Sequence, residues 1–599
     1  MGSKTKERRS VFKGALSVIT VLLILYLQHC QLSYSASVAI RKLLFMAPQW
    51  QLINCMISAV PFLLFLLLTS RVKLSLLLSS ILVTVLSVAN NFTLLFHGSP
   101  FLASDFYSIP TAMNVLSEYH FNLGPLTWRI LFLALAEIVL IVILYVFRGP
   151  KRKIKWFVSM AAMAVNAALI YFLFFSPWTV FPHSLFTWSW GPAVNEYGYE
   201  LCLLNSCSLL RNRYQIPEGY SAEIIEFTEC DPFSDGSYPD VVIILNETLC
   251  DLSFYAPVPE GREVIDDLFK IPTISSGYST ASLVGGGTNN TEYELLTSNS
   301  MAGLTITAPF QLLNMNGADS VVSYLKWMGY NTAAMHCGNA TNYGRNNAYP
   351  AMGFDQLYLG LDSFDYFREY GNRNWLDEDN YLDMLEAYEA MGDGPRLMYL
   401  LTFQNHGGYE QNEPEWDTVS IQEDFGEYTD DVNEYLTSVQ MSALAFKQLT
   451  EYFADSARPV IILMVGDHAP SFIQYLPAKP GITGLEKEIA LRTVPYFVWA
   501  NFEIDNSALA ARSSMVDLVP MMLKAADFPL TSYYKTILDL NKNVPVRTMD
   551  GAAMDAEGNY FRIGEDTKYS SILQQYYYME YNALRRADDY RPELFSLAH

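Results

Sequence analysis

Residues 460–468 read VIILMVGDH, six apolar residues followed by a glycine, an acid and a histidine. An uninterrupted apolar run of this length is typical of a strand buried on both faces, as in parallel sheets that are covered by helices. Four similar runs occur nearby, VVIIL (241–245), TAAM (332–335), MYLLTF (398–403) and YFVWA (496–500). The stretch therefore predicts one strand of a mostly parallel sheet.

Segments of helical character separate these runs, for example residues 377–391 and 431–453. Alternating strands and helices predict an α/β domain over about 240–545, with the sheet sandwiched between helices. Residues 546–599 are expected to form a C-terminal extension, in which 566–592 contains an amphipathic helix. The chain shows no internal repeat.

Polar residues follow the apolar runs, where an open α/β sheet places its ligand site. All three histidines between residues 240 and 545 are among them. The residues concerned are Asn246 and Glu247 after the first run, His336 after the second, Gln404, Asn405 and His406 after the third, and Asp467 and His468 after the fourth.

Glu247, Asp467 and His468 offer oxygen and nitrogen donors that one sheet edge would bring together. A divalent cation needs such a donor set, and these residues provide three ligands. The stretch GGGTNNTEYELLTS (285–298) offers a fourth, because Thr288 directly follows three glycines whose backbone can approach a metal closely. A phosphate-binding P-loop is excluded, since no Lys-Ser/Thr pair follows. Thr291 and Glu292 are expected to begin the next helix by capping-type hydrogen bonds.

Charge divides the chain into two parts. Residues 1–178 hold 15 Lys and Arg against 4 Asp and Glu, whereas residues 179–599 hold 24 against 58, a net charge of −34. A polyanion of this size does not bind nucleic acid by neutralising phosphates. The acidic excess instead favours a large domain that stays soluble.

The first part contains five apolar runs that approach the ~20 residues needed to cross a bilayer. They lie at about 11–29, 52–70, 74–96, 126–147 and 156–176. The first begins with basic residues like a signal peptide, but no small-residue cleavage site follows, so it is expected to be retained. Residues 1–177 are thus predicted to be a membrane domain with five transmembrane helices, and the aromatic-rich segment 178–239 an interfacial linker.

The basic residues between the spans set the expected orientation. With the N-terminus inside, inner segments hold twelve Lys and Arg and outer segments three. The inner ones are Lys4, Lys6, Arg8, Arg9, Lys13, Arg71, Lys73, Arg148, Lys151, Arg152, Lys153 and Lys155, and the outer ones are Arg41, Lys42 and Arg129. This bias predicts a cytoplasmic N-terminus and a catalytic domain outside the cell.

Seven cysteines are few for a chain of this length, and no C-x-x-C metal pattern occurs. The odd number beyond the last span argues against a full disulfide framework. Cys202 and Cys207 could pair within the linker.

Four motifs, in order after the five spans, resemble those of a known family. GGGTNNTE, HCGNATNYGR (336–345), QNHGGY (404–409) and GDH (466–468) are similar to motifs of the lipoteichoic acid synthases and their relatives. These are five-span membrane proteins with an extracellular sulfatase-like domain of the alkaline phosphatase superfamily. The resemblance covers essentially the whole architecture and is most specific from about 240 to 530.

The resemblance implies roles for individual residues. Thr288 matches the nucleophile, and Glu247, Thr288, Asp467 and His468 match the residues that hold one divalent ion, with Mn²⁺ expected and Mg²⁺ or Zn²⁺ as alternatives. His336, Tyr343 and Arg345 match the segment around the substrate phosphate and glycerol. His406 matches a histidine that faces the phosphate and exchanges a proton.

The implied activity is a phosphoglycerol transferase in a bacterial cell membrane. Metal-bound Thr288 would take a glycerol phosphate from a membrane phospholipid such as phosphatidylglycerol and pass it to a cell-envelope polymer or glycolipid, without ATP. Two positions depart from the frequent family pattern, Tyr343 in place of Trp and Asn289-Asn290 in place of Ser-Asp. They bear on the head group and the acceptor more than on the chemistry.

Several other functions were weighed against this one. A true sulfatase needs a Cys or Ser in C/S-x-P-x-R, but CDPFS at Cys230 lacks the arginine and precedes the first strand. A phosphoethanolamine transferase has a similar plan but usually several ectodomain disulfides. A lipoteichoic acid primase remains open. A non-catalytic membrane sensor would be expected to lack a metal ligand, and none is missing.

Overall fold

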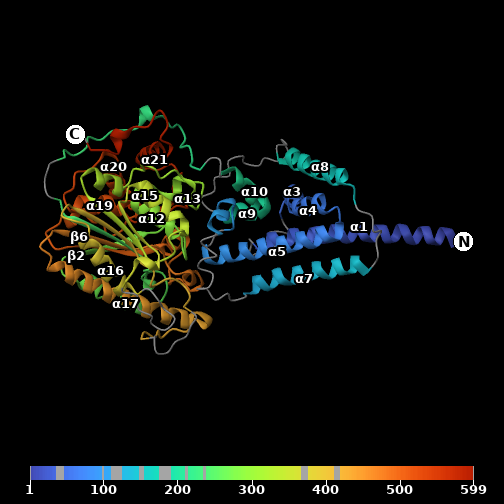
Figure 1. The fold of residues 1–599 in the computed structure, drawn as a ribbon, viewed down its shortest axis with the longest axis horizontal. Coiled ribbons are helices and arrows are strands. Elements are labelled where there is room, and N and C mark those ends of the chain that lie inside the picture. The colour runs from blue at the N-terminus through green and yellow to red at the C-terminus, as the bar shows by residue number, and fades with distance from the viewer. Residues whose placement is uncertain are drawn as a thin grey trace. The chain divides into compact units, whose positions relative to one another are not determined.

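The computed structural model describes residues 2–35, 46–97, 100–109, 124–146, 154–174, 190–209, 213–233, 238–365, 376–409 and 418–597. The chain forms two compact units, and each is described by itself (Figure 1). The first unit comprises residues 1–103 and 121–211, and the second comprises residues 104–120 and 212–599.

The first unit contains five helical stretches that are long and apolar enough to cross a membrane, which confirms the predicted number. The second stretch consists of two helices, with Pro61 in the first turn of the latter, where proline is tolerated. The helices are α1 (Gly2–Ser35), α3 (Pro48–Ser58), α4 (Val60–Thr69), α5 (Val72–His97), α7 (Pro125–Val146) and α8 (Trp156–Phe174). Six of the basic residues behind the predicted orientation lie outside the described residues, namely Arg41, Lys42, Arg148, Lys151, Arg152 and Lys153.

Part of the predicted linker belongs to this first unit. Helices α9 (Trp190–Tyr197) and α10 (Tyr199–Leu209) fall within it, while residues 178–189, 210–212 and 234–237 of the linker lie outside the described residues. Glu200 of α10 is buried and accepts hydrogen bonds from Ser33 and Ser58, and it lies 2.7 Å from His29 Nδ1. These contacts attach α10 to α1 and α3.

A seven-stranded sheet in the order β2-β7-β6-β1-β5-β3-β4 forms the centre of the second unit. Strands β6, β1, β5, β3 and β4 run parallel, as the apolar runs predict. The run at 496–500 lies in β7, which is antiparallel to both of its neighbours. The strands are β1 (Asp240–Asn246), β2 (Ile274–Thr280), β3 (Asn331–His336), β4 (Gln356–Leu359), β5 (Arg396–Leu401), β6 (Val460–Gly466) and β7 (Thr493–Ala500).

Helices cover both faces of this sheet, as expected for an α/β domain (Figure 1). The helices α16 (Asp377–Glu389) and α17 (Thr429–Ala454) agree with the predicted segments and lie on one face. The remaining helices are α11 (Glu260–Glu263), α12 (Thr288–Thr297), α13 (Pro309–Leu312), α14 (Val321–Trp327), α15 (Arg345–Met352), α18 (Gly484–Ala490), α19 (Leu518–Ala525), α20 (Ser532–Asn543) and α21 (Ser570–Arg585).

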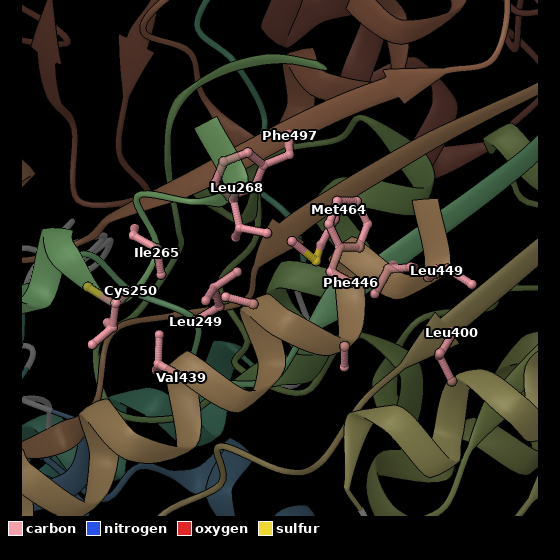
Figure 2. Close-up of a cluster of buried hydrophobic side chains, with 14 of the residues drawn as sticks. Leu249, Cys250, Ile265, Leu268, Leu400, Val439, Phe446, Leu449, Met464 and Phe497 are labelled. Atoms are coloured by element: carbon pink, nitrogen blue, oxygen red, sulfur yellow. The ribbon is translucent and has the colours of Figure 1, made fainter. Parts of the chain in front are cut away.

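The core between the sheet and α17 is a continuous apolar cluster (Figure 2). Leu400 of β5 and Met464 of β6 point from the sheet toward Phe446 and Leu449 of α17. Because side chains alternate across a strand, every second residue of the buried strands enters this cluster and the others face the opposite helices. Each fully buried side chain of this size contributes about 1.5–3 kcal/mol, so the strands are fixed firmly enough to hold the residues at their ends.

The C-terminal extension packs against the back of α12. A small antiparallel sheet of β8 (Val546–Arg547), β9 (Ala552–Met554) and β10 (Tyr560–Arg562) precedes α21. Tyr576 of α21 and Tyr533 of α20 both donate hydrogen bonds to the Ser298 carbonyl at the end of α12. Glu580 of α21 is buried, and a side chain at Gly303 would meet its carboxyl group at 2.7 Å. The predicted helix in 566–592 is therefore present and covers α12.

Two buried carboxyl groups at this contact make stability depend on pH. Burial raises the pKa of Glu294 in α12 from its ordinary 4.5 to about 7, and burial together with Glu294 raises the pKa of Glu580 well above the ordinary value. Both groups bind protons more tightly in the folded state, so their contribution to stability is complete below about pH 4.5 and declines as the pH rises toward 7.

We predict that the thermal unfolding midpoint of the second unit falls between pH 5 and pH 8, and that Glu294→Gln makes this fall smaller. A single group with this shift changes the free energy of unfolding by about 3 kcal/mol. Midpoints measured across this range in detergent test the prediction, with the exposed Glu451→Gln as control. The same dependence on pH in Glu294→Gln and wild type would contradict it.

Candidate active site

Strand register places two carboxylates at the same level of neighbouring strands. β1 and β6 are parallel and pair Asn246 with Gly466, so Glu247 and Asp467 leave the sheet side by side. The strand end tolerates only glycine at 466, because a Cβ there would lie 1.9 Å from the Leu249 carbonyl oxygen. The glycine of the GDH motif therefore allows the two chain segments to approach.

Glu247, Asp467 and His468 form a buried cluster, as the positions after the strands predict. One ligand atom from each lies within 4.8 Å of the others, and their exposed fractions are 3%, 0% and 5%. The His468 Nε2 atom lies 3.2 Å from Asp467 Oδ2 and 3.8 Å from Glu247 Oε1. The three side chains thus converge on one point.

The hydrogen bonds of this cluster fit a bound cation. Asp467 Oδ1 accepts from the backbone N–H groups of Thr248 and His468, while Asp467 Oδ2 accepts no hydrogen bond in the described structure. His468 donates from Nδ1 to the Ala469 carbonyl, which leaves a lone pair on Nε2 facing the carboxylates. Burial and the nearby Asp467 raise the pKa of Glu247 well above its ordinary value. Two acids and an imidazole lone pair meeting without a donor suit a divalent ion.

Thr248 supports both carboxylates and was not foreseen from the sequence. Its backbone has φ 52°, which is rare for a β-branched residue and occurs mostly where the surrounding structure enforces it. In this conformation its N–H donates to Asp467 Oδ1 at 2.6 Å and its hydroxyl donates to Glu247 Oε1 at 2.8 Å. The only signal in the sequence is a hydroxyl residue directly after a strand-end acid.

The three glycines before Thr288 have backbone angles that other residues avoid. Gly285, Gly286 and Gly287 have φ values of 69°, 147° and 80°, and a Cβ on Gly287 would lie 2.6 Å from the Leu283 side chain. This sharp turn ends directly in α12, whose first residue is Thr288. The glycines are therefore required by the path of the chain.

Two hydrogen bonds tie the glycine loop and α12 to the segment that carries the metal ligands. The Gly285 N–H donates to the Ala469 carbonyl at 2.9 Å, and the Thr291 hydroxyl donates to the Asp467 carbonyl at 2.8 Å. Thr288 is 7% exposed, and its hydroxyl makes no hydrogen bond with the described residues. The loop thus holds an uncommitted hydroxyl one turn of helix from the Asp467 contact.

Glu292 has a different role from the one expected. Helix α12 begins at Thr288, so the prediction that Thr291 and Glu292 begin it is wrong. Glu292 is fully buried and accepts from Arg345 Nε at 2.9 Å and from Nη2 at 2.6 Å. Its other oxygen accepts from the hydroxyls of Tyr349 and Tyr399. The spacing of Glu292 and Arg345 in the chain gave no indication of this pair.

Arg345 is therefore only partly available to a substrate. Its Nε and Nη2 groups bind Glu292, so the expected fork around a phosphate reduces to the remaining edge of the guanidinium. The guanidinium carbon lies 5.0 Å from the centre of the Tyr343 ring. Tyr343 has φ 55°, and burial raises the pKa of its hydroxyl to about 12. The structure therefore brings Tyr343 and Arg345 together, as the motif predicts.

His336 and His406 are both set up as proton acceptors. His336 donates from Nδ1 to the Leu401 carbonyl and His406 from Nδ1 to the Gly407 carbonyl, so in each ring Nε2 carries the lone pair. Burial lowers the pKa of His406 to about 4 and that of His336 well below its ordinary value. The Phe403 ring stacks on His406 at 4.5 Å and lies 6.0 Å from His336.

The other polar residues after the strands form a supporting network. Asn246 donates to Asp377, and Asn405 donates to the side-chain oxygen of Asn246. The Gln404 side-chain oxygen accepts from the Asp377 N–H. These buried amides connect the ends of β1 and β5 with the start of α16, and they point to one another instead of joining the metal cluster.

The cysteines do not supply a catalytic group at this site. All seven are free, so the Cys202–Cys207 pair considered above is not formed. The Cys230 thiol donates to the carbonyls of Glu593 and Ser596 in the C-terminal extension. A formylglycine derived from this residue would therefore form away from the strand ends.

Comparison with known sequences agrees with this architecture. The sulfatase family model matches residues 239–528, so this part of the chain is a sulfatase-type domain. A putative cyclic β-1,2-glucan modification protein of Rhizobium meliloti (strain 1021) is 24% identical over 350 residues, covering 54% of this chain and 54% of that protein. The capsular polysaccharide biosynthesis protein RkpI of the same organism is 24% identical over 42% of this chain and 44% of that protein. The chain thus spans about half the length of these curated relatives.

A similar solved structure is the Streptococcus pyogenes phosphoglycerol transferase GacH in complex with sn-glycerol-1-phosphate. It is 17% identical, with a TM-score of 0.48, over 64% of this chain and 97% of that one.

We predict that Mn²⁺ raises the unfolding midpoint of the wild-type protein and not that of Asp467→Asn. A ligand that binds only the folded state stabilises it, and about 2–4 °C or more is expected for a unit of this size. Without metal, Asp467→Asn should unfold at the wild-type temperature or above it, because one of two facing charges is removed. The exposed Asp455→Asn is the control. An equal response to Mn²⁺ in Asp467→Asn and wild type would exclude the site.

Gly287→Ala is expected to weaken Mn²⁺ binding on the order of tenfold, because a left-handed alanine costs about 1–2 kcal/mol and its methyl displaces the loop. Gly329→Ala is a matched control, since Gly329 has φ 90° and no atom within 4 Å of an added Cβ. Calorimetric titration with Mn²⁺ should show a weaker affinity for the first variant alone. Equal affinities in both variants would mean that the loop does not shape the site.

Proposed function

We propose that the protein transfers a glycerol phosphate, or a related phosphate head group, from a membrane phospholipid such as phosphatidylglycerol to a cell-envelope polymer or glycolipid. The observation that carries the proposal is the uncommitted Thr288 hydroxyl, which two hydrogen bonds of its loop hold close to the buried Glu247–Asp467–His468 cluster. Transfer through a covalent intermediate on this threonine needs no nucleotide. The donor lipid and the lipoteichoic acid type of product are part of the proposal.

In the first half of the reaction, the Thr288 oxygen attacks the phosphorus of the lipid. A new Oγ–P bond forms, the bond between phosphorus and the glycerol oxygen of diacylglycerol breaks, and glycerophospho-threonine remains. The Thr288 proton passes to His406, which returns it to the departing oxygen. The low pKa of His406 suits this exchange, because the ring is unprotonated at neutral pH and releases a proton readily.

In the second half, a hydroxyl of the acceptor attacks the same phosphorus. His406 accepts the proton of this hydroxyl and delivers it to the Thr288 oxygen as the Oγ–P bond breaks. The free edge of Arg345, with His336 and Tyr343, is assigned to the phosphate and its glycerol. The enzyme thereby returns to its starting state, and general acid–base exchange of this kind contributes about 10²–10⁴-fold.

Glu247, Asp467 and His468, together with Thr288, would hold the divalent ion, for which we propose Mn²⁺ ahead of Mg²⁺ or Zn²⁺. When bound, such an ion lowers the pKa of a coordinated hydroxyl and neutralises charge on phosphoryl oxygens. The fit rests on the unpaired Asp467 Oδ2 and the His468 lone pair.

The acceptor and the location are proposed from the rest of the chain. Both curated relatives bear names that refer to polysaccharides, which supports a carbohydrate-containing acceptor. Five apolar helices would keep the domain beside its lipid donor. We propose a bacterial cell membrane, with a cytoplasmic N-terminus and an extracellular catalytic domain.

We predict that the full-length protein with Mn²⁺ releases diacylglycerol from fluorescent phosphatidylglycerol, and that Thr288→Ala abolishes the release. Thr288→Ser should keep part of it, because a hydroxyl remains. Thr341→Ala, which removes an exposed hydroxyl, is the control for the substitution itself.

Equal release by Thr288→Ala and wild type would exclude the mechanism. Release from phosphatidylethanolamine and not from phosphatidylglycerol would instead identify a phosphoethanolamine transferase. Addition of a single glycerol phosphate to a glycolipid acceptor would identify a primase.

A further inference from the structure

The positive charge of Arg345 is cancelled inside the protein before any substrate binds. The side chains of Arg345 and Glu292 are 3% and 0% exposed, and two hydrogen bonds to one carboxylate oxygen join them. The other oxygen accepts from Tyr349 and Tyr399. With a donor on each oxygen and a cation beside it, Glu292 is held in its ionised form, so the pair has no net charge.

The remaining groups of the site also sum to no charge. The Glu247 and Asp467 carboxylates carry two negative charges, which the proposed divalent ion balances. Burial keeps His336 and His406 neutral by lowering the pKa of each. Tyr343 is neutral as well, since its pKa is raised to about 12.

A neutral, largely buried site distinguishes substrates by their charge. A phosphodiester brings one negative charge, which the free edge of Arg345 can still hydrogen-bond. A phosphomonoester brings two negative charges above its second pKa, and Glu292 repels the additional one. Such repulsion is strong where water is excluded.

We propose that Glu292 makes this site select phosphodiesters over phosphomonoesters, by cancelling the charge of Arg345 while holding its guanidinium in place. This inference rests on the proposed phosphotransferase function and adds a charge-selecting residue to it. The bound class is a singly charged phosphodiester, as in a phospholipid head group. The glycerol phosphate monoester released by any wasteful hydrolysis would be rejected.

A purely structural role of Glu292 predicts a different outcome. If Glu292 only positioned Arg345, its loss would lower the turnover of monoesters and diesters alike. If Glu292 selects by charge, the two substrates respond differently. Moreover, removing the charge of Arg345 must shift the preference in the opposite direction.

The kinetic test compares methyl p-nitrophenyl phosphate with p-nitrophenyl phosphate, which share a leaving group, at pH 8 with Mn²⁺. Glu292→Gln is expected to raise the ratio of monoester to diester kcat/KM by about 10–100-fold. Arg345→Gln should lower this ratio. Glu378→Gln, an exposed acid on α16, should leave it at the wild-type value. An unchanged ratio in both site variants would overturn the proposal.

A binding test needs no turnover and so separates this inference from the proposed function. Calorimetry with methyl phosphate and dimethyl phosphate at pH 8, with and without Mn²⁺, measures the preference for one or two charges directly. Glu292→Gln should strengthen methyl phosphate binding about tenfold or more relative to dimethyl phosphate. Wild type that turns over neither ester but shows this shift would retain the charge selection and lose the proposed function. Equal changes for both ligands would leave Glu292 a structural residue.

Discussion

Two carboxylates that leave neighbouring strands at the same level, with no donor between them, impose the constraint on which this site depends. The pairing of β1 with β6 puts Glu247 beside Asp467, and burial denies them the solvent that would screen their repulsion. The surrounding structure makes this arrangement tolerable. Thr248 donates to both acids from a strained backbone, and His468 turns a lone pair toward them. A cation is the natural partner of this geometry.

Much of this arrangement is predictable from the sequence, because it follows from the ends of strands. Parallel strands have a recognisable apolar pattern, and their carboxyl ends meet at one edge, so Glu247, Asp467 and His468 could be grouped without coordinates. The partners that come from elsewhere could not. Glu292 and Arg345 are 53 positions apart and meet only because α12 and the start of α15 pack together.

The sheet shows a similar limit. The apolar run in β7 identifies a buried strand, but burial on both faces is the same for parallel and antiparallel neighbours, so its direction was not evident. β2, with the sequence ISSGYST, carries too few apolar residues to be recognised, and the short β4 lies at the sheet edge. Amides after the strands were equally ambiguous, since Asn246 and Asn405 turned out to bind each other.

The helix that begins at Thr288 is closed from behind by the end of the chain. Tyr533 and Tyr576 bond to its last turn, and Glu580 fills the space beside Gly303. Residues 570–585 are among the last to leave the ribosome, so this contact cannot form while synthesis is under way. The domain therefore completes its core only after translation of nearly the whole chain. A truncated product of translation would contain every proposed ligand and still lack the support for its central helix.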